Sequence, residues 1–128
     1  MAEVTSARID EIEAIQGFAT FRRARSALGV NAFGMSIIDM PPNATEYPEH
    51  DHSGEVGGQQ PGQEEVYVAL SGSGFLEAGG ERYPLDQEHI VRVGPGTKRK
   101  ILPGEEGLRL LALGGVPGEA YKPAEIRR

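Results

Sequence analysis

Two histidines and one glutamate are the residues of this chain whose types and order are best suited to chemistry. His50 and His52 are separated by one residue, and Glu65 begins the next extended, apolar run. Side chains two residues apart on a β-strand point to the same face, so both imidazoles would face one way and Glu65 could meet them across a sheet. Two imidazoles and a carboxylate suit a divalent transition metal such as Fe, Mn, Ni or Zn, and they leave coordination positions open. The pattern predicts a metal site at His50, His52 and Glu65.

The elements that must position these residues are short strands separated by turns. The chain has 18 glycines and 9 prolines in 128 residues, and runs rich in Val, Ile and Tyr lie between them. This alternation is typical of an all-β sandwich or barrel. Gly79 and Gly80 predict a hairpin turn. Strands are expected at residues 33–40, 66–70, 75–78, 81–85, 89–93 and 108–113.

The first 27 residues are expected to pack on the barrel as a separate N-terminal part. Ile9, Ile12 and Ile15 recur at a spacing of three, which predicts a short helical turn within residues 6–15. Residues 19–27 contain three arginines and predict an edge strand that is protected from pairing with another chain. The expected organisation is therefore a helix and edge strand over residues 1–27 and a barrel domain over residues 28–128.

The composition disfavours several classes of function. A formal net charge of -6 argues against a surface for nucleic acid or for anionic membranes. The chain has no cysteine, which excludes disulfides and thiolate metal sites. No stretch is long enough to span a bilayer, and the acidic N-terminal residues do not look like a secretory signal. A cytoplasmic location is the resulting expectation.

The order of the candidate site residues resembles the first motif of the cupin superfamily. In that motif a His-x-His pair precedes a glutamate, and a glycine follows after six further residues. His50, His52, Glu65 and Gly72 occupy those positions. The resemblance extends from residue 28 into the tail and implies a small single-domain cupin. It implies an all-β double-stranded β-helix, the cupin jelly-roll barrel, with a short N-terminal helix, and a homodimer, because small cupins commonly pair through strand edges.

Two departures from the family pattern affect the predicted site. The segment between His52 and Glu65 is longer than usual, and residues 53–64 are rich in Gly and Gln, which predicts a surface loop. The family's second motif ends in a histidine that supplies a fourth metal ligand. Aligned on Gly96, this chain has Arg99 at that position. His89 falls at a turn position of the motif, so a turn role is favoured for it.

Two interpretations of the function stay open. In the first, the two histidines and Glu65 bind a divalent metal, and Arg99 and Tyr67 contact a small anionic metabolite, with oxygenase or isomerase chemistry as an option. Arg99 would hold a carboxylate by two hydrogen bonds, and Tyr67 would line the pocket or fill the barrel. In the second, the permanent charge of Arg99 repels a divalent cation and pairs with Glu65, which gives a metal-free ligand-binding or structural cupin. Whether the protein is an enzyme is undecided.

Overall fold

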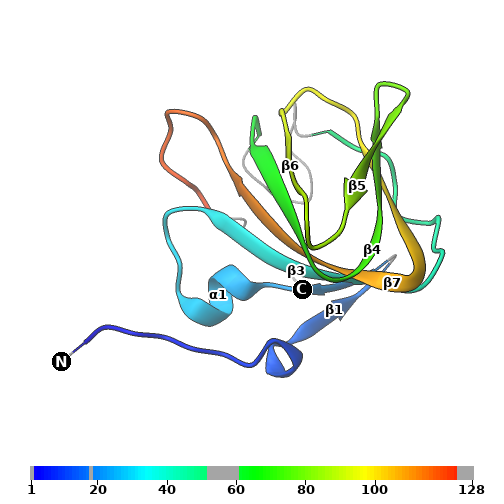
Figure 1. Cartoon of the computed structure of the whole chain (residues 1–128). Helices are drawn as coiled ribbons and strands as arrows, with labels where there is room; N and C mark the ends of the chain where they lie inside the picture. The colour runs from blue at the N-terminus through cyan, green and yellow to red at the C-terminus, as the bar shows by residue number, and fades with distance from the viewer. Residues whose placement is uncertain (1, 18, 52–60, 124–128) are drawn as a thin grey trace.

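In the computed structural model, the described residues are 2–17, 19–51 and 61–123, and within them seven strands form an antiparallel sheet (Figure 1). The strand order is β1-β2-β3-β7-β4-β5, and β6 pairs with β4. The elements in chain order are η1 (Ile9–Glu11), β1 (Ala14–Gln16), β2 (Thr20–Arg22), α1 (Ala24–Leu28), β3 (Gly34–Met40), β4 (Glu64–Ala78), β5 (Glu81–Leu85), β6 (Ile90–Val93) and β7 (Lys100–Gly115). The predicted all-β fold is confirmed.

The long strands β4 and β7 pair with each other along most of their length and bend together. Their register runs from Glu64 opposite Gly115 to Glu77 opposite Lys100, with irregularities between Ala69 and Ser71 and between Gly72 and Gly74. Bulges of this kind bend a strand and increase its twist. β6 therefore pairs with the first part of β4, and β5 pairs with the last part. Because of the bend, the β4–β7 pair extends through both halves of the barrel.

Gly72, the glycine of the motif, is needed for this bend. Its φ is +72°, a left-handed conformation that side chains with a Cβ rarely adopt. A Cβ at this position would lie 2.1 Å from the carbonyl oxygen of Gly107 on β7. The motif glycine therefore has a structural role, since it allows close contact between the two bent strands.

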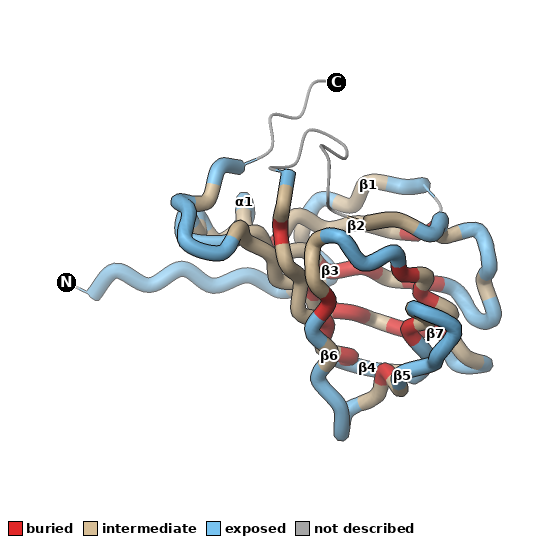
Figure 2. The backbone as a smooth tube through the Cα atoms, turned by 90° about the horizontal axis from the view of Figure 1, so that it is seen from above, coloured by how far each residue is buried: buried red, intermediate tan, exposed pale blue. Residues whose placement is uncertain are grey.

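The core lies on the inner face of the curled sheet, where buried positions recur on β3, β4 and β7 (Figure 2). Ile38, Leu110 and Ala69 are register partners on these strands, and all are less than 5 % exposed. Alternate residues of a strand share a face, so Tyr67 joins the same inner face. The buried cluster comprises Ala19, Ile38, Met40, Tyr67, Ala69, Leu76, Leu85, Val93, Ile101, Leu108, Leu110 and Ala112.

The N-terminal region differs from the prediction in two respects. Thr20–Arg22 does form a strand, but Ala24–Leu28 is a helix, so the strand prediction over 19–27 was wrong for its second half. The helix ends at Gly29, which has φ +77° and donates its N–H to the carbonyl of Arg25, as glycine commonly does after a helix. β2 pairs with β1 on one side and with β3 on the other, so β1 is the edge of the sheet and the predicted edge position of the strand within 19–27 was also wrong. The division at residue 28 stays a prediction.

The predicted helical turn near the N-terminus is present as the single 3-10 turn η1. The helices of the described residues are too short and too polar for any of them to cross a membrane.

Candidate functional site

Two backbone hydrogen bonds place His50 directly opposite Arg99. The His50 N–H donates to the Arg99 carbonyl at 2.9 Å, and the Arg99 N–H donates to the His50 carbonyl at 2.8 Å. Side chains of directly opposed residues in an antiparallel pair lie on the same face. The fold thus brings one predicted metal ligand next to Arg99, the predicted ligand-binding arginine.

The Arg99 side chain is fully buried, with 0 % of it exposed. Its Nη1 donates to Oε1 of Glu65 at 3.4 Å, and its Nη2 donates to the carbonyl of Gly94 at 2.8 Å. The Nε–H of Arg99 is buried and meets no acceptor among the described residues. A buried charge is costly unless it is paired, and the Glu65 carboxylate supplies that pairing here.

Glu65 and Tyr67 lie on the same face of β4 and are hydrogen-bonded. The Tyr67 hydroxyl donates to Oε1 of Glu65 at 2.5 Å, and Tyr67 is only 1 % exposed. Burial, followed by the charge of Glu65 and this hydrogen bond, raises the pKa of Tyr67 well above its ordinary value. One carboxylate oxygen therefore accepts from both Tyr67 and Arg99, and the charge on Glu65 strengthens both bonds.

An aromatic residue that the sequence analysis did not select also lies at this centre. Tyr47 contacts His50 edge-to-face, with ring centroids 5.7 Å apart, and contacts Phe21 at 5.9 Å. Burial, followed by the charge of Glu65, raises the pKa of Tyr47 to about 12. The only sequence signal for Tyr47 was an aromatic residue three positions before His50 in an otherwise polar loop.

His50 is oriented by the loop that precedes it. Its Nδ1 lies 3.2 Å from the carbonyl oxygen of Pro48. In the tautomer with a proton on Nδ1, this nitrogen donates to Pro48 and the lone pair lies on Nε2. Histidines that bind metals are commonly oriented by such a second hydrogen bond.

The predicted three-ligand metal set is not tested by the described residues. His52 and residues 53–60 of the predicted loop lie outside them. Within the described ranges, no group of three or more His, Cys, Asp or Glu side chains is placed to hold a metal ion. The donors that are described, His50 and Glu65, stand beside the permanent positive charge of Arg99 and do not by themselves fit a divalent cation.

Two further titratable residues, His89 and Glu64, lie on the surface. His89 is exposed and its Nδ1 lies 2.7 Å from Oδ1 of Asp86 in a turn. Glu64 lies on the opposite face of β4 from Glu65 and pairs with the exposed Arg92 at 2.8 Å. Neither residue belongs to the centre around Arg99.

The architecture is similar to that of several solved cupins. A cupin protein from Bacteroides fragilis is 22 % identical over 95 % of this chain and 93 % of that chain, with a TM-score of 0.68. A predicted oxalate decarboxylase from Thermotoga maritima is 21 % identical over 88 % and 99 %, with a TM-score of 0.66. A cupin 2 conserved barrel domain protein from Salinispora arenicola is 19 % identical over 91 % of each chain, with a TM-score of 0.63.

These similarities show that the chain has the cupin fold, an all-β jelly-roll barrel. The resemblance predicted from the motif is thereby confirmed at the level of the fold. No family model and no curated protein matches the sequence.

Proposed function

We propose that this protein binds a small acidic metabolite inside the cupin barrel, at a metal-free polar centre formed by Arg99, Glu65 and Tyr67. One observation carries the proposal: Arg99 is fully buried, yet its Nε–H meets no acceptor among the described residues. An unsatisfied buried donor costs about 1–3 kcal/mol. A ligand oxygen at that N–H would remove this cost.

The charges of the centre support an oxygen-bearing ligand over a cation. Glu65 already accepts from both Arg99 and Tyr67, so its negative charge is compensated. Arg99 lies where the family has its last metal-binding histidine, and its charge opposes a divalent ion at close range. Because the guanidinium has no exposed surface, a ligand reaches it only when neighbouring side chains move, and the proposal includes that rearrangement.

The names of similar proteins also favour an acidic ligand. The Thermotoga maritima neighbour is a predicted oxalate decarboxylase, and a cupin of similar fold from Silicibacter pomeroyi is a sugar phosphate isomerase. Oxalate and sugar phosphates are both small anions. Carboxylates and phosphates are the groups that the planar donor edge of arginine recognises well.

The test is calorimetric titration of chelator-treated protein, of measured metal content, with a panel of dicarboxylates and sugar phosphates. We expect binding by at least one panel member and loss of about 5–150-fold in affinity in Arg99→Lys, the factor that corresponds to 1–3 kcal/mol. Lysine keeps the charge but lacks the Nε donor. Arg92→Lys, at an exposed arginine, is the matched control and should bind normally. Equal binding by Arg99→Lys and wild type would contradict the proposal.

A second candidate function, divalent metal binding by His50, His52 and Glu65, is favoured by the contact between His50 Nδ1 and Pro48. Elemental analysis of protein purified without added metal separates the two candidates. Stoichiometric Fe, Mn, Ni or Zn that is lost in His50→Ala would establish the metal site. Metal below stoichiometry, with normal folding, supports the metal-free centre.

A further inference from the structure

Tyr47 is held in a fixed position beside the barrel centre. It lies in the loop before the bridge between His50 and Arg99, and its ring contacts Phe21 on β2 at 5.9 Å and His50 at 5.7 Å. The ring also packs against the buried core cluster. Close packing on several sides leaves an aromatic side chain few alternative rotamers. The fold therefore sets the direction in which the Tyr47 hydroxyl points.

The hydroxyl of Tyr47 is an open hydrogen-bond donor. It forms no hydrogen bond with a side chain or backbone group of the described residues. Tyr67 differs, because its hydroxyl donates to Glu65. A phenol has one proton to donate, so Tyr67 has none left for a ligand. Tyr47 is only half-buried, so a ligand oxygen can take the place of water at its hydroxyl.

Tyr47 lies in the same electrostatic environment as the buried pair of Arg99 and Glu65. Burial, followed by the charge of Glu65, raises the pKa of Tyr47 to about 12, and the charge of Arg99 limits this rise. A charged group shifts a neighbouring pKa in this way only when it is close. The open phenol of Tyr47 and the buried Nε–H of Arg99, which also lacks an acceptor among the described residues, therefore belong to one centre.

We propose that Tyr47 determines which acid the barrel binds, because it donates a hydrogen bond to a second oxygen of the ligand, near the carboxylate that Arg99 binds. This role rests on the proposed function, in which the Nε–H of Arg99 meets an acidic group. The ligand class is then a hydroxy acid or an oxo acid, and an unsubstituted carboxylic acid binds less tightly.

Two separate donors discriminate between acids better than one donor does. An acid without a second oxygen satisfies the Nε–H of Arg99 and leaves the Tyr47 phenol without a ligand contact. A site built to hydrogen-bond a particular oxygen discriminates against the analogue that lacks this oxygen. Glu65 does not compete for the ligand, because its Oε1 already accepts from Tyr67 and Arg99.

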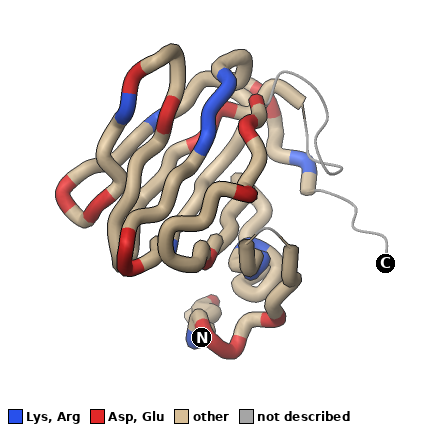
Figure 3. The backbone as a smooth tube through the Cα atoms, turned by 90° about the vertical axis from the view of Figure 1, so that its right-hand side faces the viewer, with Lys and Arg blue, Asp and Glu red and all other residues tan. Residues whose placement is uncertain are grey.

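The surface of the protein offers no general attraction for acids. The chain has a formal net charge of -6, and acidic and basic positions are interspersed along the strands and loops (Figure 3). A mixed surface with a negative total does not concentrate anions. Selective affinity for an acid should therefore depend on donors placed inside the barrel.

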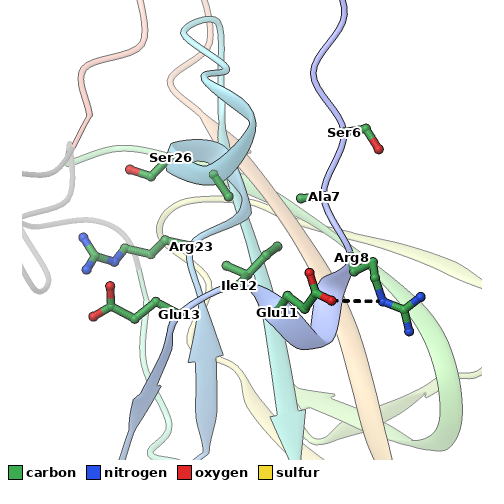
Figure 4. Close-up of a pocket in the computed structure, with 9 residues that line it drawn as sticks. Ser6, Ala7, Arg8, Glu11, Ile12, Glu13, Arg23 and Ser26 are labelled. Atoms are coloured by element: carbon green, nitrogen blue, oxygen red, sulfur yellow. Dashed lines mark ion pairs between the residues drawn. The ribbon is translucent and has the colours of Figure 1, made fainter.

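A cleft outside the barrel also carries arginines and calls for a control. It has a volume of about 560 Å³, lies between residues 6–8 and α1, and contains none of the residues of the barrel centre (Figure 4). Arg8 pairs with Glu11 at its rim, whereas Arg23 forms no ion pair with a described residue. Arg23→Gln removes this charge from the cleft and leaves the barrel centre intact.

The test compares two acids that differ by one hydroxyl, malate and succinate, in calorimetric titrations of the chelator-treated full chain. A longer pair, 2-hydroxyglutarate and glutarate, is titrated in the same way. We expect the wild type to bind the hydroxy acid about 2–12-fold more tightly, the factor for one ordinary hydrogen bond. Tyr47→Phe should remove this preference and keep the affinity for the unsubstituted acid, because the ring contacts stay. A merely structural role of Tyr47 would weaken both acids equally.

Tyr83→Phe is the matched control, since it removes an exposed phenol that donates to Glu81 on β5. It should keep both affinities, and so should Arg23→Gln. Equal binding of both members of each pair by the wild type, or a preference that survives Tyr47→Phe, would overturn the role of Tyr47 and leave the proposed function standing. Binding that is lost in Arg23→Gln, or absent for every acid, would overturn both.

Discussion

Glu65→Gln tests the physical basis of the centre because glutamine keeps the shape of glutamate and removes its charge. The Glu65 carboxylate is 12 % exposed and lies 3.4 Å from Nη1 of Arg99, which is fully buried. At an effective dielectric constant of about 20, a unit charge pair at this distance interacts by about 5 kcal/mol. Breaking a buried pair by removing one partner typically costs about 3–5 kcal/mol, because the other charge stays buried. We expect a loss near 3 kcal/mol, because the glutamine oxygen can still accept from Tyr67.

Glu64→Gln is the control for this prediction, since it makes the same substitution one residue away on the opposite face of β4. Its partner Arg92 is 63 % exposed, so the ion pair should contribute about 0–1 kcal/mol. Urea unfolding, followed by circular dichroism, measures both losses in free energy of unfolding. The difference in free energy of unfolding between Glu65→Gln and Glu64→Gln should be unchanged when a chelator is present. If Glu65→Gln costs no more than Glu64→Gln, the buried pair does not stabilise the centre and the reasoning is refuted.

Three other predictions concern the same barrel. As the pH rises from about 10 to 12, Tyr47 loses its phenol proton in the unfolded state but retains it in the folded state, so the free energy of unfolding should fall by on the order of 2 kcal/mol. Tyr47→Phe should reduce this fall, as measured by urea unfolding at each pH. An unchanged dependence on pH would contradict the raised pKa of Tyr47. Gly72→Ala should lower the free energy of unfolding by more than about 3 kcal/mol, because the added Cβ clashes with β7. Gly79→Ala, which also has a positive φ but faces open space, should lower it by about 1 kcal/mol. Equal melting temperatures of the two variants would argue against the tight bend. Arg99→His, which places an imidazole beside His50 and Glu65, should increase the bound divalent metal measured by elemental analysis. No increase would show that Arg99 is not what prevents binding.

Most strands could be predicted from the sequence because their patterns depend on local geometry. Gly79 and Gly80 predicted the hairpin, and both have positive φ, 59° and 79°, as a tight two-residue turn requires. β7 is longer than predicted, since the expected strand covered only residues 108–113, whereas β7 begins at Lys100 and runs through Pro103. Pro103 is accommodated opposite Gly74, where a Cβ would lie 2.4 Å from the Leu102 carbonyl. Such close packing between distant residues leaves no local pattern.

The candidate site was predicted in part. The pairing of Arg99 with Glu65, one of the two interpretations left open, is present, because the motif positions of the cupin pattern meet in the barrel. Tyr47 was missed, since its contacts with His50 and Phe21 depend on how a loop packs against β2. The buried Nε–H of Arg99 could not be predicted either, because it follows from side-chain placement and not from residue order.

Nuclear magnetic resonance of the Arg99 Nε–H group in metal-free protein would show whether a ligand oxygen accepts a hydrogen bond from this buried donor. The signal would be assigned by its disappearance in Arg99→Lys, and acidic ligands from the panel would then be added. We expect a bound ligand to shift this signal strongly, because its oxygen becomes the acceptor that the buried donor lacks among the described residues. A ligand that binds in the barrel but leaves the Arg99 Nε–H signal unshifted would contradict the proposed contact.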